Sequence, residues 1–372
     1  MHRLLHPRLS GAGAPRGRQA RVRTGSRTGP DPLEPKLPGP ISYRSAGVDI
    51  AAADELLEDL GERLKSTYTP LVLAGLGGFG GAMRLPPGMS DPALVLSIDS
   101  VGTKIAVAAR HGRLESIGAD LVNHCANDVL AMGARPLAFL DYVAHSDLPN
   151  SALEAAIGGV ADACLKHSVP LIGGETAQLP GIYRSGQLDL VGAMVGVAET
   201  EQLLTPDRVS SGDLLIGLPS NGIHTNGYSL VQRALDGLDH SAHNPEVGRP
   251  LIDEMLAVHR SYVNELTPFL DRIHGLAHIT GGGICANTAR IVPPGLSAQF
   301  GWGSWQVPPI FHLIQRRAQI GFEELAQVFN LGLGMVVIGR RELADDLVRQ
   351  IPGSTLVGQV IESAGARAEI LR

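Results

Sequence analysis

The chain contains 372 residues, of which 44% are hydrophobic, 4% are aromatic and 46 are glycine, and its formal net charge is −6. This length suits two domains of about 100–200 residues each, and the composition is typical of a globular α/β enzyme that is rich in tight turns. No segment approaches the roughly 18 consecutive apolar residues of a transmembrane helix, and the three widely separated cysteines indicate neither a disulfide framework nor a zinc site. We therefore expect a cytoplasmic protein without a membrane partner.

The charge is unevenly distributed along the chain. Residues 1–40 carry eight basic and two acidic side chains, which leaves 23 basic and 35 acidic side chains for the rest. Because a nucleic-acid footprint requires a basic surface, the acidic body argues against nucleic-acid binding. The Arg-, Gly- and Pro-rich first 40 residues are predicted to be disordered, and three interpretations stay open: a segment upstream of the true translation start, a dispensable tail, or a targeting sequence.

The first patterned region alternates helical and extended segments. Leu56, Leu57, Leu60 and Leu64 recur at helical spacing and predict a helix over about 51–65. Further elements are predicted in chain order: a glycine-rich loop over 75–81, a strand over 94–98, a helix over 117–132, a strand over 136–143, a helix over 152–166, a strand around 169–172 and a strand over 189–197.

A second patterned region begins after residues 205–209, whose turn chemistry predicts a linker. Its predicted elements are a strand over 213–218, a loop over 219–229 that leads into a helix with Asn226 as N-cap, a long helix over 252–273 and a strand that begins near 332. The chain is therefore divided into a disordered tail (1–40), an N-terminal domain (41–205) and a C-terminal domain (206–372).

The segment Asp99–Lys104, directly after the apolar strand, carries the clearest chemical signal. It combines a carboxylate, a flexible bend, a hydroxyl and an ammonium, which are the groups that hold a metal–nucleotide complex. The spacing is not that of a Walker A loop. The alternative for this segment is an ordinary surface turn with a solvated lysine.

Other glycine-rich segments adjoin polar side chains. The loop over 75–81 contains five glycines and either approaches a ligand with its backbone or is simply flexible. Glu175 follows two glycines at a strand end, and His224 lies near a predicted helix start, where anions are favoured. A solvated loop histidine is the alternative for His224, and close strand–helix packing is the alternative for the triple glycine over 281–283.

Eight segments in the same order resemble the aminoimidazole ribonucleotide synthetase (phosphoribosylformylglycinamidine cyclo-ligase) family, over about residues 41–372. They are Tyr43 with Ala46–Ile50, Gly75–Gly80, Asp99–Lys104, Asn127-Asp128, Gly173–Ala177 with Pro180-Gly181, His224 with Asn226–Ser229, Thr280–Gly283 and Phe329–Met335. The resemblance implies an α/β (α+β type) two-domain fold whose N-terminal domain pairs across a dimer barrel. It implies a homodimeric ligase of purine biosynthesis that cyclises formylglycinamidine ribonucleotide to aminoimidazole ribonucleotide, using ATP and Mg²⁺.

The resemblance also assigns roles to individual residues. Asp99 and Asp128 are implied metal ligands, and Asp99, Lys104 and His224 are implied catalytic residues. The implied nucleotide-binding residues are Gly77, Gly78, Phe79, Gly80, Val101, Gly102, Thr103 and Lys104, and the implied substrate-binding residues are Glu175, Thr176, His224 and Asn226.

Two departures and two rival functions accompany this assignment. Ser100 stands where the family usually has glycine, and residues 59–65 offer only Arg63 and Lys65 where relatives have a more basic helix end. A kinase or selenophosphate synthetase of the same fold is one rival, although no cysteine precedes Cys125 to serve the latter. The other is a non-catalytic nucleotide-binding regulator, which would tolerate loss of Asp99, Lys104 or His224, and all three are present.

Overall fold

The computed structural model describes residues 50–372. Helix α1 (Ile50–Lys65) opens this part, as the leucine spacing predicted, and Leu56, Leu60 and Leu64 on it are buried. The glycine-rich loop connects the short strands β1 (Val72–Ala74) and β2 (Ala82–Met83). The sequence predictions for residues 1–40 and for the segment around Tyr43 lie outside the described residues.

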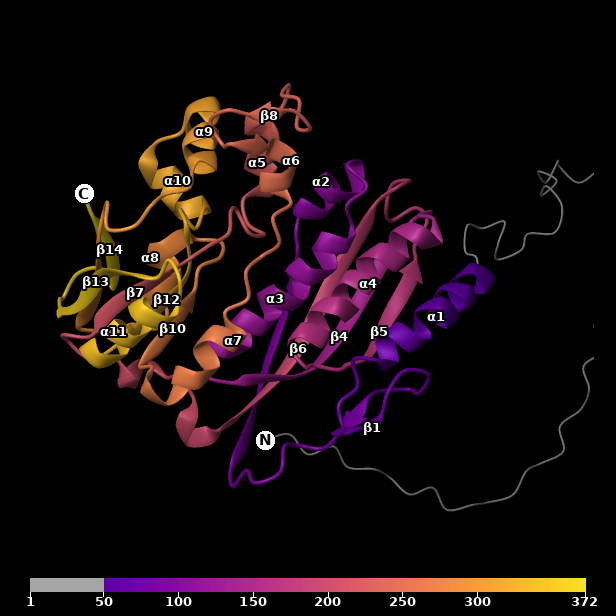
Figure 1. Cartoon of the computed structure of the whole chain (residues 1–372), viewed down its shortest axis with the longest axis horizontal. Helices are drawn as coiled ribbons and strands as arrows, with labels where there is room; N and C mark the ends of the chain where they lie inside the picture. Colours follow the sequence, from indigo (N-terminus) through magenta and orange to yellow (C-terminus); the bar gives the residue numbers. More distant parts are fainter. Residues whose placement is uncertain (1–49) are drawn as a thin grey trace, which may run out of the picture. The chain divides into compact units, whose positions relative to one another are not determined.

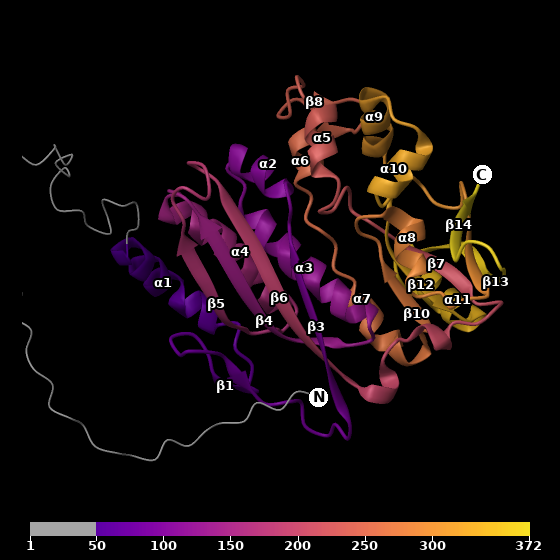
Figure 2. The same ribbon diagram turned by 180° about the vertical axis from the view of Figure 1, so that it is seen from behind.

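A four-stranded sheet forms the centre of the N-terminal half (Figure 1). Its order is β3 (Pro92–Ser100), β6 (Leu188–Glu199), β4 (Arg135–His145) and β5 (Leu171–Gln178), so that β3 and β5 are the two edges. Helices α3 (Glu115–Ala131) and α4 (Asn150–Lys166) pack along one face of this sheet, as both views show (Figures 1 and 2). These elements match the predicted ones, whereas helix α2 (Lys104–Arg110) was not predicted.

The face of the sheet opposite α3 is apolar and exposed. Along β3, Leu94, Leu96 and Ile98 are 53%, 72% and 71% exposed, and they alternate with residues that face α3. The register places Val195 beside Leu96 and Ala193 beside Ile98, so the apolar surface continues onto β6. Monomers rarely leave such a contiguous apolar surface exposed to water.

Glycines allow α3 and α4 to approach each other closely. A Cβ on Gly118 of α3 would lie 2.3 Å from the carbonyl oxygen of Ala156, and a Cβ on Gly159 of α4 would lie 2.1 Å from that of Glu115. Real Cβ atoms do not come this near to backbone atoms, so the crossing depends on the absence of side chains here. The close packing against α4 holds α3 in position, and α3 carries His124 and Asp128.

A six-stranded sheet forms the C-terminal half, in the order β10-β12-β7-β13-β11-β14. These strands are β7 (Leu214–Pro219), β10 (Gly275–His278), β11 (Leu296–Gly301), β12 (Leu333–Gly339), β13 (Thr355–Glu362) and β14 (Ala368–Leu371). The accompanying longer helices are α5 (Tyr228–Ala234), α8 (Gly283–Ala289), α9 (Pro309–Ala318), α10 (Phe322–Val328) and α11 (Arg341–Gln350), and β8 (His243–Asn244) and β9 (Arg249–Pro250) form a small hairpin. The predicted strands over 213–218 and from 332 are confirmed.

The long helix predicted over 252–273 is wrong. The segment divides into α6 (Leu251–Met255), α7 (Val263–Leu266) and a 3₁₀ turn (Thr267–Arg272), with an extended stretch between the two helices. Side chains of α3 hold that stretch: Asp120 accepts the His259 N–H at 2.6 Å, Asn123 donates to the His259 carbonyl at 2.7 Å, and Asn127 donates to the Arg260 carbonyl at 2.8 Å. These long-range bonds replace the local bonds of a helix.

The predicted N-cap of α5 is also wrong. Gly227, in the left-handed conformation at φ 78°, takes the N-cap position, and no side chain caps the helix. A side chain at this position would collide with Phe329, because a Cβ on Gly227 would lie 2.4 Å from its ring. The proposed division of the chain at residue 205 stays a prediction.

Candidate active site

Strand β3 presents Asp99 to a histidine on α3. Oδ2 of Asp99 lies 2.9 Å from Nε2 of His124, and Oδ1 accepts the Ser100 backbone N–H at 2.7 Å. The side chain of Asp99 is 40% exposed, whereas the side chain of His124 is buried. Burial disfavours the ionised carboxyl, but the hydrogen bond and the charge of His124 outweigh it, so the pKa of Asp99 lies below its ordinary value.

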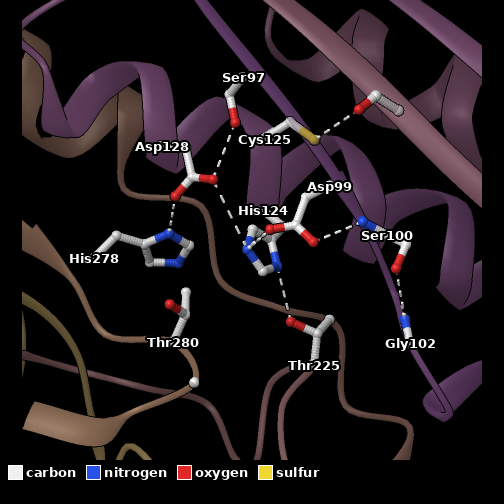
Figure 3. Close-up of polar contacts among 12 residues, drawn as sticks. Ser97, Asp99, Ser100, Gly102, His124, Cys125, Asp128, Thr225, His278 and Thr280 are labelled. Atoms are coloured by element: carbon white, nitrogen blue, oxygen red, sulfur yellow. Dashed lines mark hydrogen bonds and ion pairs between the residues drawn. The ribbon is translucent and has the colours of Figure 1, made fainter. Parts of the chain in front are cut away.

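Asp128, one turn further along α3, lies between two histidines (Figure 3). Its Oδ1 is 2.8 Å from Nδ1 of His278, at the end of β10, and its Oδ2 is 3.9 Å from Nε2 of His124. Ser97 donates to Oδ2 at 3.1 Å. The hydrogen bond to His278 outweighs burial and lowers the pKa of Asp128, while Asp99 and Asp128 outweigh burial and raise the pKa of His124.

Two further side chains connect the far nitrogens of these rings. Nδ1 of His124 is 2.9 Å from the Thr225 hydroxyl, which is itself 3.3 Å from Nδ1 of His259. Nε2 of His259 lies 2.9 Å from Nε2 of His278. Asp99, His124, Thr225, His259, His278 and Asp128 therefore form one continuous polar chain between the two halves of the described structure.

His224 stacks on His259, with ring centroids 3.9 Å apart. It is buried, and neither of its ring nitrogens has a hydrogen-bond partner among residues 50–372. Burial and the neighbouring histidines and Lys104 hold its pKa well below the usual range, so the ring is neutral at pH 7. The backbone at His224 is left-handed, at φ 66°, which is uncommon for a residue with a side chain.

Lys104 does not lie on the surface of the site. Its Nζ contacts Asp120, at 2.9 Å from Oδ1 and 2.8 Å from Oδ2, and donates to the Ala257 carbonyl at 2.8 Å. Neither charged side chain has exposed area. The position differs from the phosphate contact predicted from the sequence, because the first turn of α2 directs this side chain inward onto α3. Direct contact of Lys104 with a phosphate stays a prediction.

The loop between β3 and α2 combines one buried and two exposed residues. Val101 is buried, Gly102 is left-handed at φ 55°, and the Thr103 hydroxyl lies 3.3 Å from that of Ser229. Ser100 accommodates its side chain without disturbing the bend, since its Oγ accepts the Gly102 N–H at 3.4 Å. The loop therefore keeps exposed backbone next to Asp99.

The remaining predicted residues line a different cavity, of about 760 Å³, between α1 and β5. Gly77, Glu175 and Thr176 contribute to it, together with Asp141, whose pKa burial raises to about 7. Gly78, Phe79 and Gly80 are exposed in the neighbouring loop. β3 and β5 are the opposite edges of one sheet. Within one chain, the residues of this cavity on β5 therefore lie three strand spacings, roughly 14 Å, from Asp99 on β3.

A second cavity, of about 690 Å³, contains Asp99, His124, Asp128, His278 and Thr280 in its wall. The sequence prediction included Asp99 and Asp128 but missed His124, Thr225, His259 and His278. His124 and Asp128 are four residues apart on a predicted helix and therefore lie on one face of it. This spacing could have identified His124 as a candidate site residue. The contacts of His259 depend on the extended stretch that the sequence pattern did not predict. Asn226 has its Oδ1 near Gly281, where an added Cβ would be 3.2 Å away.

Comparisons with known proteins show which family the chain belongs to. Residues 81–198 match the family described as "AIR synthase related protein, N-terminal domain", and residues 210–370 match its C-terminal counterpart. The chain is 43% identical over 312 residues to a phosphoribosylformylglycinamidine cyclo-ligase of Sorangium cellulosum, covering 82% of this chain and 90% of the relative. It is 40% identical over 342 residues to one of Bifidobacterium animalis subsp. lactis, covering 89% and 99%.

The chain belongs to the phosphoribosylformylglycinamidine cyclo-ligase family. This membership confirms the family resemblance found in the sequence, and it makes the chain an enzyme of that family.

The cyclo-ligase family shares its fold with other proteins. The structure superposes on thiamine-monophosphate kinase from Stenotrophomonas maltophilia with a TM-score of 0.62 at 18% identity, covering 85% of this chain and 95% of the kinase. It superposes on a hydrogenase maturation protein HypE, solved in complex with ATP, with a TM-score of 0.60 at 19% identity, covering 87% and 93%. The predicted two-domain fold is therefore confirmed. Within residues 50–372, none of the helices is both long and apolar enough to cross a membrane.

Proposed function

We propose that this protein catalyses the ATP-dependent cyclisation of formylglycinamidine ribonucleotide to aminoimidazole ribonucleotide, with release of ADP and phosphate. The observation that carries the proposal is the family membership over most of the chain, together with two carboxylates, Asp99 and Asp128, that line one cavity. The reaction belongs to purine biosynthesis, and we place the protein in the cytoplasm.

The chemistry requires activation of a poor leaving group. Transfer of the γ-phosphoryl group of ATP to the formyl amide oxygen gives an iminophosphate, whose carbon is then attacked by the substrate amine. The ring closes, and the former amide oxygen leaves as part of inorganic phosphate. Enzymes that transfer phosphoryl groups act mainly by positioning the reactants and stabilising charge. Both tasks suit a site with fixed carboxylates and exposed backbone at its edge.

The donor set fits Mg²⁺ at Asp99 and Asp128. Both carboxyls have lowered pKa values, are partly exposed and face one cavity, and carboxylate oxygens are the ligands that Mg²⁺ prefers. When bound there with ATP, the ion would neutralise charge on the phosphate oxygens. The protein's own contribution is to hold both carboxylates: His124 fixes Asp99, while His278 and Ser97 fix Asp128.

The other predicted residues receive distinct roles in this proposal. Gly102 and Thr103 offer exposed backbone and a hydroxyl to phosphate, and Lys104 acts as a positioning residue through Asp120 and the 257–262 stretch. His224, neutral and without a hydrogen-bond partner in the described chain, is available to accept a hydrogen bond from substrate once a small movement opens its pocket.

We further propose that a homodimer completes the site. The exposed apolar face built from Leu94, Leu96 and Ile98 on β3 continues across the sheet towards β5. If two copies pair through this face, Gly77, Glu175 and Thr176 of one copy can approach the Asp99 cavity of the other. Pairing would bring together two groups of predicted site residues that lie at opposite edges of the four-stranded sheet within one chain.

A coupled assay of ADP release tests the function. We expect release that depends on formylglycinamidine ribonucleotide, with aminoimidazole ribonucleotide formed in equal amount. The rivals give other results: a kinase of the same fold would transfer phosphate to thiamine monophosphate, a selenophosphate synthetase would consume selenide, and a regulator would bind ATP without turnover. ADP release that is indifferent to formylglycinamidine ribonucleotide would contradict the proposal.

A further inference from the structure

We propose that His124, Asp128 and His278 form a binding site for a borderline divalent cation of the Zn²⁺ and Co²⁺ class, which takes imidazole nitrogen as ligand. The site would bind such an ion more tightly than Mg²⁺. The inference concerns binding alone and does not depend on the proposed reaction.

The three potential ligand atoms converge from two elements. One ring nitrogen of His124, one of His278 and a carboxylate oxygen of Asp128 all lie within 4.8 Å of one another. Figure 3 shows the carboxylate of Asp128 between the two rings. Zinc–nitrogen and zinc–oxygen bonds of about 2.0–2.2 Å place neighbouring ligands roughly 3–4 Å apart, so small side-chain rotations suffice to close the set around an ion.

Each ring is held by the nitrogen that faces away from Asp128. Nδ1 of His124 contacts the Thr225 hydroxyl at 2.9 Å, and Nε2 of His278 contacts Nε2 of His259 at 2.9 Å. Metal-binding histidines are almost always oriented by a second hydrogen bond of this kind. Both rings are buried, which restricts their rotation further.

The hydrogen-bond chain can be satisfied while both facing nitrogens remain bare. With three neutral rings, His124 and His259 each donate Nδ1–H to the Thr225 oxygen, which can accept two such bonds. His278 then donates Nε2–H to Nε2 of His259. Every contact among these four residues is kept. The lone pair on Nε2 of His124 then faces Asp99, at 2.9 Å, and Asp128, at 3.9 Å, and the lone pair on Nδ1 of His278 faces Asp128, at 2.8 Å. A bound ion would therefore replace the hydrogen bonds that these two histidines donate to Asp99 and Asp128 in its absence.

The surroundings leave room for further ligands. The three residues line the 690 Å³ cavity, so water can occupy the remaining coordination positions. Two nitrogens and one carboxylate with open positions is a set typical of Zn²⁺ and related ions, whereas Mg²⁺ prefers oxygen ligands and retains its waters. Since Asp128 is shared, an ion at this site would compete with Mg²⁺ for that carboxylate.

Cobalt titration of the full-length protein, without nucleotide or substrate, tests the proposal. Co²⁺ absorbs in the visible range with an intensity that rises as nitrogen ligands replace water and the coordination number falls. We expect one equivalent per chain with such a spectrum, displaced by Zn²⁺ and not by an equal concentration of Mg²⁺. A weak spectrum like that of the aqueous ion, or displacement by equimolar Mg²⁺, would overturn the proposal.

Graded variants separate ligation from folding. Thr225→Val removes the hydrogen bond that orients His124, which should lower the affinity for Co²⁺ by about 10–100-fold. His124→Gln removes the ligand itself and should lower that affinity further. His274→Gln is the matched control, because Nδ1 of His274 also lies 2.8 Å from an aspartate, Asp213, but outside this cavity. The Co²⁺ affinity of this variant should equal that of the wild type. Thermal unfolding of each variant reports whether it is folded. Unchanged affinity in folded His124→Gln would overturn the proposal, as would equal losses in His124→Gln and His274→Gln.

Discussion

Nζ of Lys104 lies 2.9 Å from Oδ1 and 2.8 Å from Oδ2 of Asp120, and neither side chain has any exposed surface. Burial lowers the pKa of Lys104 and raises that of Asp120, while each partner's charge opposes the change. The pair links α2 to α3, and the Ala257 carbonyl joins it to the stretch that carries His259. Lys104, which the family resemblance assigns to phosphate binding, thus lies beneath the site and connects the elements that form it.

Lys104→Met should therefore destabilise the fold as well as lower activity. Removing one partner of a buried pair leaves an uncompensated charge, which costs about 3–5 kcal/mol. Lys104→Met combined with Asp120→Asn should recover at least half of that loss, because the amide oxygen of the substituted side chain can still accept the His259 N–H. Denaturant unfolding measures both values. Wild-type stability in the single variant would show that the pair is not formed in solution.

The sequence pattern predicted the elements that depend on local periodicity. Leu56, Leu60 and Leu64 predicted α1, and the apolar run over 94–98 predicted β3. The prediction failed where long-range contacts decide the conformation: the stretch around His259 has a helical pattern, yet Asp120 and Asn127 hold it extended from another element. The sequence pattern also missed the contacts among four histidines, because these residues come from four separate segments: His124, His224, His259 and His278.

Asp141→Asn should change the pH dependence of stability. Burial raises the pKa of this carboxyl from 3.8 to about 7, so the folded protein keeps a proton that the unfolded chain loses between these values. Stability from this group is present below pH 3.8 and is lost as the pH rises through about 7. Relative to wild type, the variant should therefore gain more in melting temperature at about pH 8.5 than at about pH 5.

Asp147→Asn is the control for that measurement. Hydrogen bonds from Ser185, Gly186 and Ser146 lower the pKa of Asp147 to about 2, so its stabilising effect is lost only as the pH falls through that value. The difference in melting temperature between Asp147→Asn and the wild type should be the same at both pH values. An Asp141→Asn difference that also stays constant would contradict a raised pKa.

Gly118→Ala should destabilise the α3–α4 crossing. The added Cβ would lie 2.3 Å from the Ala156 oxygen, and such overpacking typically costs about 1–3 kcal/mol. Gly61→Ala on α1 is the matched helical control, because its Cβ would meet nothing within 4 Å. That variant should gain about 0.5–1 kcal/mol from helix propensity. Chemical denaturation of both proteins gives the comparison, and equal effects would argue against the close crossing.

Leu96→Glu should disrupt the proposed dimer. The side chain is 72% exposed in the centre of the apolar face, and a buried charge there would be unfavourable. Val348→Glu, on α11 and also exposed, is the control and should leave the assembly unchanged. Analytical ultracentrifugation reports the mass. A dimer that survives Leu96→Glu would place the interface elsewhere.

The fate of the formyl oxygen tests the proposed reaction most directly. If phosphorylation activates the amide, substrate labelled with ¹⁸O in the formyl group should yield inorganic phosphate that carries one labelled oxygen per turnover. His224→Ala should slow the reaction without redirecting the label, because that side chain is proposed to bind and not to accept the phosphoryl group. Label recovered in water, with unlabelled phosphate, would contradict cyclisation through an iminophosphate.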